Sequence, residues 1–196
     1  MPKQLALFES QPSEPEGLRY AADFVSPAIE ENLILAIQAL PLQPFQFGEF
    51  EGKRRVASFG FRYDYALRQL RSADPVPSWM AEIVSKVETF GGAGIRIEQI
   101  LCTEYEMGVG IGWHRDKPHF EKIFGLSLGS ACRLRFRRSA GKKWDRLTLD
   151  VKPRSLYMMD GASRQIWEHS IPPVQAPRYS ITFRTMTNGP DLRTLA

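Results

Sequence analysis

Three polar residues in the second half of the chain have a spacing that suits metal chemistry. His114 and Asp116 form a His-x-Asp pair, and His169 follows after several strand-like runs. If the pair lies on a strand, its two side chains project to the same side, because residues two apart share a face. Two histidines and one carboxylate on one face of a metal ion leave its other positions open, as in non-haem Fe(II) oxygenases. The alternative is a hydrogen-bonded His-x-Asp pair on the surface.

A second pattern lies near the C-terminal end. In the run Arg178–Arg184, alternate residues would share a face, with two Arg and two hydroxyl side chains on one side and Tyr179, Ile181 and Phe183 on the other. Because a guanidinium binds a carboxylate through two hydrogen bonds, the polar face favours an anion site. Alternatively, the two arginines are solvated and only the apolar face packs on a core.

Short strands are needed to bring these patterns together. After Gly94 the sequence alternates strand-like runs with turn signals, which favours a mainly β sandwich or jelly roll. The expected strands are Arg96–Tyr105, Phe124–Leu128, Cys132–Arg138, Leu147–Val151, Ser155–Met159 and Ser180–Arg184.

The first half of the chain adds helices to this α+β arrangement. Ser26 before Pro27 is a helix start that leads into helically spaced apolar residues as far as Pro41, and a second helix is expected over Ser78–Phe90. The other expected elements are a strand within Leu18–Phe24 and short strands between residues 45 and 65 that turn at Gly48 and Gly52.

Composition sets the class of protein. The chain has 196 residues, 43% of them hydrophobic, which suits a domain with a substantial core. No apolar run approaches the roughly 20 residues of a membrane span, and no signal peptide opens the chain. With Cys102 and Cys132 alone there is no disulfide framework, so we expect two buried thiols in a cytoplasmic, monomeric protein. The net charge of +4 favours an anionic partner such as nucleic acid, or a solvated basic face with none.

Taken together, these residues resemble the AlkB family of Fe(II)/2-oxoglutarate dioxygenases. The family pattern is a Tyr nine positions before a His-x-Asp pair, then a distal His, then Arg-Tyr-Asn-x-Thr-Phe-Arg. In this chain its elements are Tyr105, His114, Asp116, His169 and Arg178–Arg184. The likeness covers residues 95–186 and, more weakly, the segment from Arg54 to Tyr65.

The resemblance implies a double-stranded β-helix, or jelly roll, that uses Fe(II), 2-oxoglutarate and O2. By this likeness His114, Asp116 and His169 are the catalytic iron ligands. Arg178 would form the salt bridge to the distal carboxylate of 2-oxoglutarate, helped by Tyr105, and Arg184 would complete the cofactor or substrate contacts. Thr103 and Ser180 replace two asparagines of the family and keep a hydroxyl for co-substrate binding.

Composition and the likeness together divide the chain into four parts. Residues 1–17 would be a flexible tail, 18–94 N-terminal helices with a nucleotide-recognition lid, 95–187 the oxygenase core, and 188–196 a C-terminal tail.

The implied reaction is oxidative demethylation of N-alkylated bases in DNA or RNA, which releases formaldehyde, succinate and CO2. Two features bear on the substrate. Pro118 stands where AlkB itself has an acidic residue that faces the base, and Phe120–Gly129 and Arg54–Val56 resemble the branch that contains the animal tRNA-modifying homologue. The alternatives are hydroxylation of a tRNA base, a protein side chain or a small molecule, and a barrel that binds nucleic acid without turnover.

Two segments are candidate nucleic-acid surfaces. Phe59, Tyr63 and Tyr65 lie where the family builds its lid and would stack on an extruded base, with His119 near the metal pair; core packing and a surface histidine are the alternatives. Arg133, Arg135 and Arg137 alternate along one expected strand, where they would contact phosphates or else protect a sheet edge.

The N-terminal tail carries one apolar segment. In Gln4-Leu5-Ala6-Leu7-Phe8, the residues Gln4, Leu5, Leu7 and Phe8 resemble the peptide by which bacterial repair and replication proteins hold the sliding clamp. This points to a bacterial AlkB-like protein with the clamp as a partner. The alternative is that the segment folds back on the domain.

Overall fold

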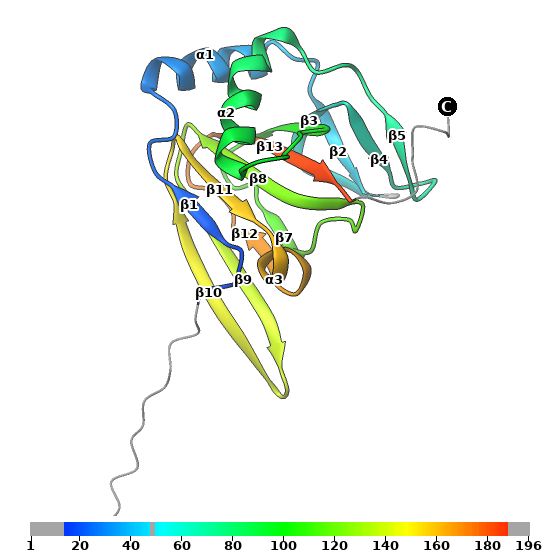
Figure 1. The fold of residues 1–196 in the computed structure, drawn as a ribbon, viewed down its shortest axis with the longest axis vertical. Coiled ribbons are helices and arrows are strands. Elements are labelled where there is room, and N and C mark those ends of the chain that lie inside the picture. The colour runs from blue at the N-terminus through cyan, green and yellow to red at the C-terminus, as the bar shows by residue number, and fades with distance from the viewer. Residues whose placement is uncertain (1–13, 48–49, 188–196) are drawn as a thin grey trace, which may run out of the picture.

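Two antiparallel sheets form the body of the molecule (Figure 1). The structure is a computed structural model that describes residues 14–47 and 50–187, so the expected clamp peptide at residues 4–8 and the tail at 188–196 lie outside the described residues. The larger sheet has the order β1-β11-β8-β13-β6-β3-β2 and the smaller one β10-β9-β12-β7. The larger sheet consists of β1 (Arg19–Ala21), β2 (Gln43–Phe47), β3 (Phe50–Phe59), β6 (Gln99–Tyr105), β8 (Phe120–Leu128), β11 (Ser155–Met159) and β13 (Arg178–Met186). The smaller sheet consists of β7 (Ile111–His114), β9 (Cys132–Ala140), β10 (Lys143–Val151) and β12 (Glu168–Ile171).

Helices cover the outer face of the larger sheet. Helix α1 (Pro27–Gln38) begins at Ser26, whose hydroxyl accepts a hydrogen bond from the Ile29 N–H at 3.3 Å, as the sequence predicts. A 3-10 turn, η1 (Ser78–Met80), leads into α2 (Ala81–Gly91). Apolar side chains of both helices pack on the sheet in one core cluster, which includes Ile37, Val87 and Ile181.

A second core lies between the two sheets and positions the polar residues. Strand β13 separates the two environments: Tyr179, Ile181 and Phe183 belong to the outer core beneath the helices. The opposite face of β13 carries Arg178 and Arg184 into the space between the sheets. The alternation expected for this strand is therefore confirmed, and the alternative of two solvated arginines is excluded because Arg178 is only 1% exposed.

The mainly β fold expected from the sequence is confirmed, with local corrections. Gly52 does not turn the chain but lies inside β3, where β2 pairs with it through an irregular register. The strand expected over Leu18–Phe24 is reduced to β1. The six strands expected after Gly94 do not include β7 or β12, although the His-x-Asp pair suggested a strand near His114. Each strand has only four residues, too few for a period of two to stand out, even in β7, where Ile111 and Trp113 alternate with Gly112 and His114. A separate hairpin of β4 (Phe61–Asp64) and β5 (Gln69–Ser72) follows β3, and a short helix α3 (Gly161–Gln165) precedes β12.

The predicted boundary of the N-terminal tail at residue 17 is too late. Pro15 is buried, the Ser163 N–H donates to the Glu16 carbonyl at 2.9 Å, and the Asp160 N–H donates to the Gly17 carbonyl at 3.1 Å. Residues 15–17 therefore pack on the start of α3, a contact between distant segments that local composition does not reveal.

Both cysteines are buried and free, as expected, with Cys102 on β6 and Cys132 on β9. Among the described residues, no helix has the length and apolar character required to cross a membrane.

We expect Gly17→Ala to destabilise the fold by about 3–4 kcal/mol. Gly17 has φ of +82°, and a Cβ there would overlap the backbone carbonyl of Asp160. The matched control is Gly94→Ala, which has φ of +77° but no described atom within 4 Å of the added Cβ and should cost about 1–2 kcal/mol. Urea denaturation measures both, and equal losses would show that the contact with Asp160 contributes nothing.

Candidate metal and co-substrate site

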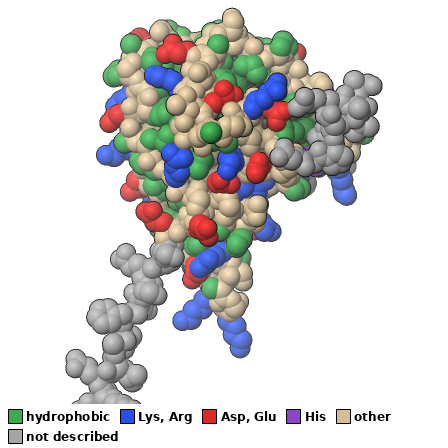
Figure 2. All heavy atoms as spheres, viewed as in Figure 1, with side chains coloured by type: hydrophobic (Ala, Val, Ile, Leu, Met, Phe, Trp, Pro, Cys, Tyr) green, Lys and Arg blue, Asp and Glu red, His purple; other side chains and the backbone are tan. Residues whose placement is uncertain are grey.

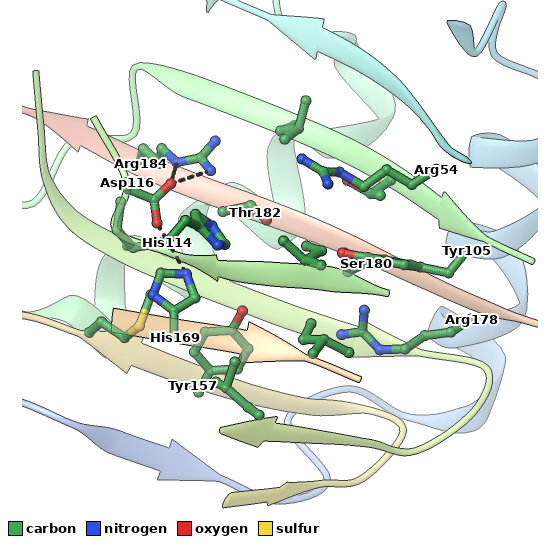
Figure 3. Close-up of a pocket in the computed structure, with 17 residues that line it drawn as sticks. Arg54, Tyr105, His114, Asp116, Tyr157, His169, Arg178, Ser180, Thr182 and Arg184 are labelled. Atoms are coloured by element: carbon green, nitrogen blue, oxygen red, sulfur yellow. Dashed lines mark hydrogen bonds and ion pairs between the residues drawn. The ribbon is translucent and has the colours of Figure 1, made fainter. Parts of the chain in front are cut away.

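A cluster of two histidines and one aspartate lies between the two sheets (Figure 3). The potential ligand atoms of His114, Asp116 and His169 all lie within 4.8 Å of one another. His114 is the last residue of β7 and pairs directly with His169 on the neighbouring β12. The sequence led us to expect Asp116 on the same strand as His114. In the structure it lies in the loop that follows the strand. The three side chains still converge, which excludes the isolated surface pair.

Hydrogen bonds fix the orientation of two of these side chains. His114 Nδ1 lies 2.9 Å from the Gly112 carbonyl, so this nitrogen carries the proton and donates it. Nε2 of His114 is thereby left with its lone pair for a metal. Asp116 Oδ1 accepts hydrogen bonds from Arg184 Nη2 at 2.7 Å and Nε at 3.2 Å, while its Oδ2 lies 3.5 Å from His169 Nε2.

The electrostatic environment favours the protonation states that bind metal. Burial opposes the charge of Asp116, but nearby Arg184, with smaller contributions from the two histidines, outweighs it and holds the pKa of Asp116 well below its usual range. Burial, together with neighbouring His114, lowers the pKa of His169 to about 3 despite the carboxylate of Asp116. The ionised carboxylate of Asp116 and the neutral imidazole of His169 are the forms that coordinate a divalent cation.

Helix α3 supports the loop that carries Asp116. Arg164 is 6% exposed, and its Nη2 donates to the carbonyls of Lys117 and Phe120 at 2.5 and 2.8 Å. Arg115 adds a more exposed hydrogen bond, from Nη1 to the Gln165 carbonyl at 3.2 Å. The sequence analysis missed Arg164, since an arginine in a short polar helix has the pattern of a surface residue.

Arg178 lies at the opposite end of the same pocket (Figure 3). Its Nε and Nη2 donate to the Ser127 hydroxyl at 3.2 and 3.1 Å, and its Cζ lies 4.9 Å from the centre of the Tyr105 ring. Nη1 is buried and has no hydrogen-bond partner among the described residues. A buried guanidinium with an unsatisfied donor and no paired carboxylate fits the carboxylate end of a small-molecule ligand.

The other expected co-substrate residues separate into two groups. Thr103 and Ser180 lie opposite each other on β6 and β13, both line the pocket and both are buried. Arg184 instead holds Asp116 and also donates to Gln99 Oε1 at 2.7 Å. In this structure Arg184 therefore positions the carboxylate of Asp116, a candidate metal ligand.

Tyr157 is a pocket residue that sequence reasoning missed. It lies on β11 opposite Gly125 of β8, and its ring occupies the space that a Cβ at Gly125 would need. Burial raises the pKa of the Tyr157 hydroxyl, which keeps it protonated as a hydrogen-bond donor. A glycine inside an apolar strand often marks the close approach of another group, so Gly125 was the available signal.

Aromatic side chains gather near Lys117, in the loop that carries Asp116. The Tyr63 ring lies 4.9 Å from that of Tyr65 and 5.8 Å from that of His119, and Lys117 Nζ lies 4.7 Å from the Tyr63 ring and 5.0 Å from the Tyr65 ring. These three expected substrate residues are therefore brought together. Phe59 is the exception, because it is buried in the outer core beneath the helices.

The row of arginines on β9 faces outward from the smaller sheet, but it is not a row of free cations. Arg133 is exposed, whereas Arg135 Nε donates to the Ser170 hydroxyl at 3.1 Å and Arg137 Nε donates to Glu168 Oε2 at 2.6 Å. The guanidinium of Arg137 also lies 4.5 Å from the rings of both Trp113 and Trp144. Figure 2 shows further Lys and Arg side chains at the projecting end of the β9–β10 hairpin, where Lys142 and Lys143 are exposed.

We expect His114→Ala, Asp116→Ala and His169→Ala each to abolish tight binding of Co(II), used as a spectroscopic probe for the divalent site. Each substitution removes one of three converging ligands. His119→Ala is the matched control, because His119 contacts Tyr63 outside the cluster and should leave the Co(II) absorption spectrum unchanged. Retained binding in any of the three variants would remove that residue from the ligand set.

We expect Arg164→Gln to weaken Co(II) binding about tenfold, the usual scale for groups that support metal ligands. Arg115→Gln, which removes only the exposed bond between the same loop and α3, should change the affinity by less than about twofold. Titration of both variants with Co(II), with their melting temperatures measured in parallel, checks this. Equal affinities would mean that Arg164 does not position the Asp116 loop.

Comparison with known proteins agrees with this geometry. A family model described as the 2OG-Fe(II) oxygenase superfamily matches residues 17–184. An Arabidopsis thaliana protein named "Alkylated DNA repair protein ALKBH8 homolog" is 30% identical over 193 residues, which cover 86% of this chain and 54% of that protein. The Mus musculus "tRNA (carboxymethyluridine(34)-5-O)-methyltransferase ALKBH8" is 30% identical over 168 residues, 81% of this chain and 24% of that protein. The chain therefore spans about half, or about a quarter, of the length of these relatives.

Solved structures share the fold. The structure of OsALKBH1 superposes with a TM-score of 0.68 at 16% identity, over 87% of this chain and 97% of that one. The structure of a prolyl-4-hydroxylase from Pseudomonas putida superposes with a TM-score of 0.62 at 15% identity, over 88% of this chain and 94% of that one. Both likenesses confirm the expected jelly roll. Because the family model spans most of the chain and the His-Asp-His cluster lies within the matched region, the chain belongs to the 2OG-Fe(II) oxygenase superfamily.

Proposed function

We propose that this dioxygenase acts on N-alkylated bases in nucleic acid and removes the alkyl group oxidatively. Family membership implies Fe(II), 2-oxoglutarate and O2 for the enzyme. The observation that carries the nucleic-acid substrate is the contact group of the Tyr63, Tyr65 and His119 rings with Lys117, the residue directly after Asp116. Rings with an adjacent cation suit a base that stacks and a phosphate that pairs.

The two ends of the pocket would bind different groups, the metal at one end and the co-substrate carboxylate at the other. His114, Asp116 and His169 would hold the metal, and the unsatisfied guanidinium of Arg178 would hold the distal carboxylate of 2-oxoglutarate. When bound, the metal and co-substrate supply the activation of O2 that hydroxylates the N-alkyl group. A hydroxymethyl group on nitrogen then leaves as formaldehyde, with succinate and CO2 as the co-products. The protein contributes orientation and a site enclosed by two sheets.

The names of the relatives support this substrate class. One is described as an alkylated DNA repair protein homologue and another as a tRNA-modifying enzyme. These names support our proposal that the chain belongs to the AlkB branch of the superfamily. The outward arginines of β9, above all the exposed Arg133, would then contact phosphates of the nucleic acid. An oligonucleotide long enough to reach them would bind more tightly than a single nucleotide in the pocket.

Turnover on matched oligomers tests the proposal. DNA and RNA of one sequence, each carrying a single N-methylated base, are incubated with enzyme, Fe(II), 2-oxoglutarate and O2, and formaldehyde and succinate are measured together. We expect the two products in equal amounts and dependent on the methylated base. Succinate with a hydroxylated base but no formaldehyde would favour a base hydroxylase instead. Succinate formation that no oligomer stimulates would overturn the nucleic-acid substrate.

We expect Arg178→Ala to raise the 2-oxoglutarate concentration needed for half-maximal turnover by roughly 30- to 1000-fold, which corresponds to about 2–4 kcal/mol for a buried charge-assisted contact. Arg178→Lys keeps the charge without the paired geometry and should lie in between. Co(II) binding without co-substrate should stay unchanged in both variants. An unaltered 2-oxoglutarate requirement in Arg178→Ala would place the carboxylate site elsewhere.

A further inference from the structure

We propose that the pocket selects bases that are neutral or anionic and disfavours cationic alkylated bases, and that Arg54 is the residue that sets this preference. The inference rests on the proposed nucleic-acid function and narrows its substrate class. It assigns Arg54 to the substrate side of the site, a role separate from those of Arg178 and Arg184.

Arg54 reaches the pocket from a third strand. It lies on β3 in the larger sheet, and Figure 3 shows its guanidinium turned along the pocket toward the end that holds the metal cluster. The guanidinium stacks on the Phe45 ring, with Cζ 3.7 Å from the ring centre. Stacking uses the face of the group and leaves its N–H donors free in the plane, so a ligand can still bind them.

No acid in the pocket neutralises this cation. Among the described lining residues Asp116 is the only carboxylate, and it is already engaged by Arg184 and faces the two histidines. Arg55, the next residue on β3, shows the contrast, because its Nε donates to Glu104 Oε2 at 2.6 Å. In the described part of the chain no ion pair joins Arg54 to an acid.

The charge that a substrate meets is therefore positive. Three guanidiniums, those of Arg54, Arg178 and Arg184, line the pocket against the single carboxylate of Asp116. A divalent metal and a dianionic co-substrate cancel each other and leave this balance unchanged. Lys117 lies at the Tyr63 and Tyr65 rings, and its neighbour Pro118 offers no carboxylate to a base.

Such a pocket discriminates between bases of equal size. 1-Methyladenine is protonated and cationic at neutral pH, whereas N6-methyladenine is neutral, so the two have the same heavy atoms and differ by one proton and its charge. Because the pocket excludes much of the solvent, repulsion from Arg54 is poorly screened and acts against the cation. A base with a carboxylate substituent would instead gain a charge-assisted hydrogen bond to Arg54. 5-Carboxymethyluridine, which is substituted on carbon and is not itself an N-alkylated substrate, therefore serves as an anionic binding probe for the pocket.

Binding to three oligomers of one sequence tests the inference. Each carries one modified base, 1-methyladenine, N6-methyladenine or 5-carboxymethyluridine, and affinity is measured by fluorescence anisotropy without O2, with Mn(II) and 2-oxoglutarate present. We expect wild-type enzyme to bind the two non-cationic oligomers at least about tenfold more tightly than the cationic one, relative to unmodified parents. Arg54→Gln should reduce this ratio, and Arg54→Glu should reverse it.

The matched control is Arg55→Gln, which removes a neighbouring charge that is paired with Glu104 and should leave the ratio unchanged. Tighter wild-type binding of the cationic oligomer, or the same ratio in all variants, would overturn the inference. Equal weakening of all three oligomers by Arg54→Glu would also overturn it, because Arg54 would then contact a phosphate. If no modified oligomer binds better than its parent, the proposed function fails and the inference fails with it.

Discussion

The ion pair between Asp116 and Arg184 is the contact on which the site depends, because it joins the two sheets at the metal cluster. Asp116 follows the last residue of β7 in the smaller sheet, and Arg184 lies on β13 in the larger one. The two side chains are 8% and 12% exposed, so neither charge is well solvated without the other. Loss of one partner of such a pair typically costs about 3–5 kcal/mol. The fold itself therefore holds the carboxylate of Asp116 in position opposite His169, so that two of the three candidate metal ligands are oriented in advance.

Buried cations around this pair couple the fold to its ligands. Arg164 and Arg178 each keep a buried donor without a partner among the described residues; Arg178 lines the pocket, whereas Arg164 lies behind the loop that carries Asp116. An unsatisfied buried donor costs free energy, and an anion that satisfies it returns that free energy as affinity. Co-substrate binding is thus expected to stabilise the folded chain as well as to prepare it for turnover.

The sequence was most informative where chemistry and periodicity coincide. On β13 the alternation of Arg178, Ser180 and Arg184 with apolar residues correctly predicted a strand with one polar face in a pocket. The three candidate metal ligands could be predicted from the sequence because few residue types bind metal and their order along the chain is distinctive. The roles of Arg164 and Tyr157 could not be predicted from the sequence, since they arise from contacts between segments that are distant in the chain. Phe59 was misassigned because an aromatic residue in a strand packs on a core or faces a ligand with the same local pattern.

The burial of both thiols bears on how the protein withstands oxidants and how it can be labelled. Burial raises the pKa of Cys102 to about 12 and also raises that of Cys132, so neither is a thiolate at neutral pH. Because these are the only cysteines in the chain, little thiolate is present to react with peroxide. A cysteine introduced at the exposed Lys142, in the β9–β10 turn, would consequently be the sole reactive thiol. A fluorophore there would report on that hairpin without background from the native residues.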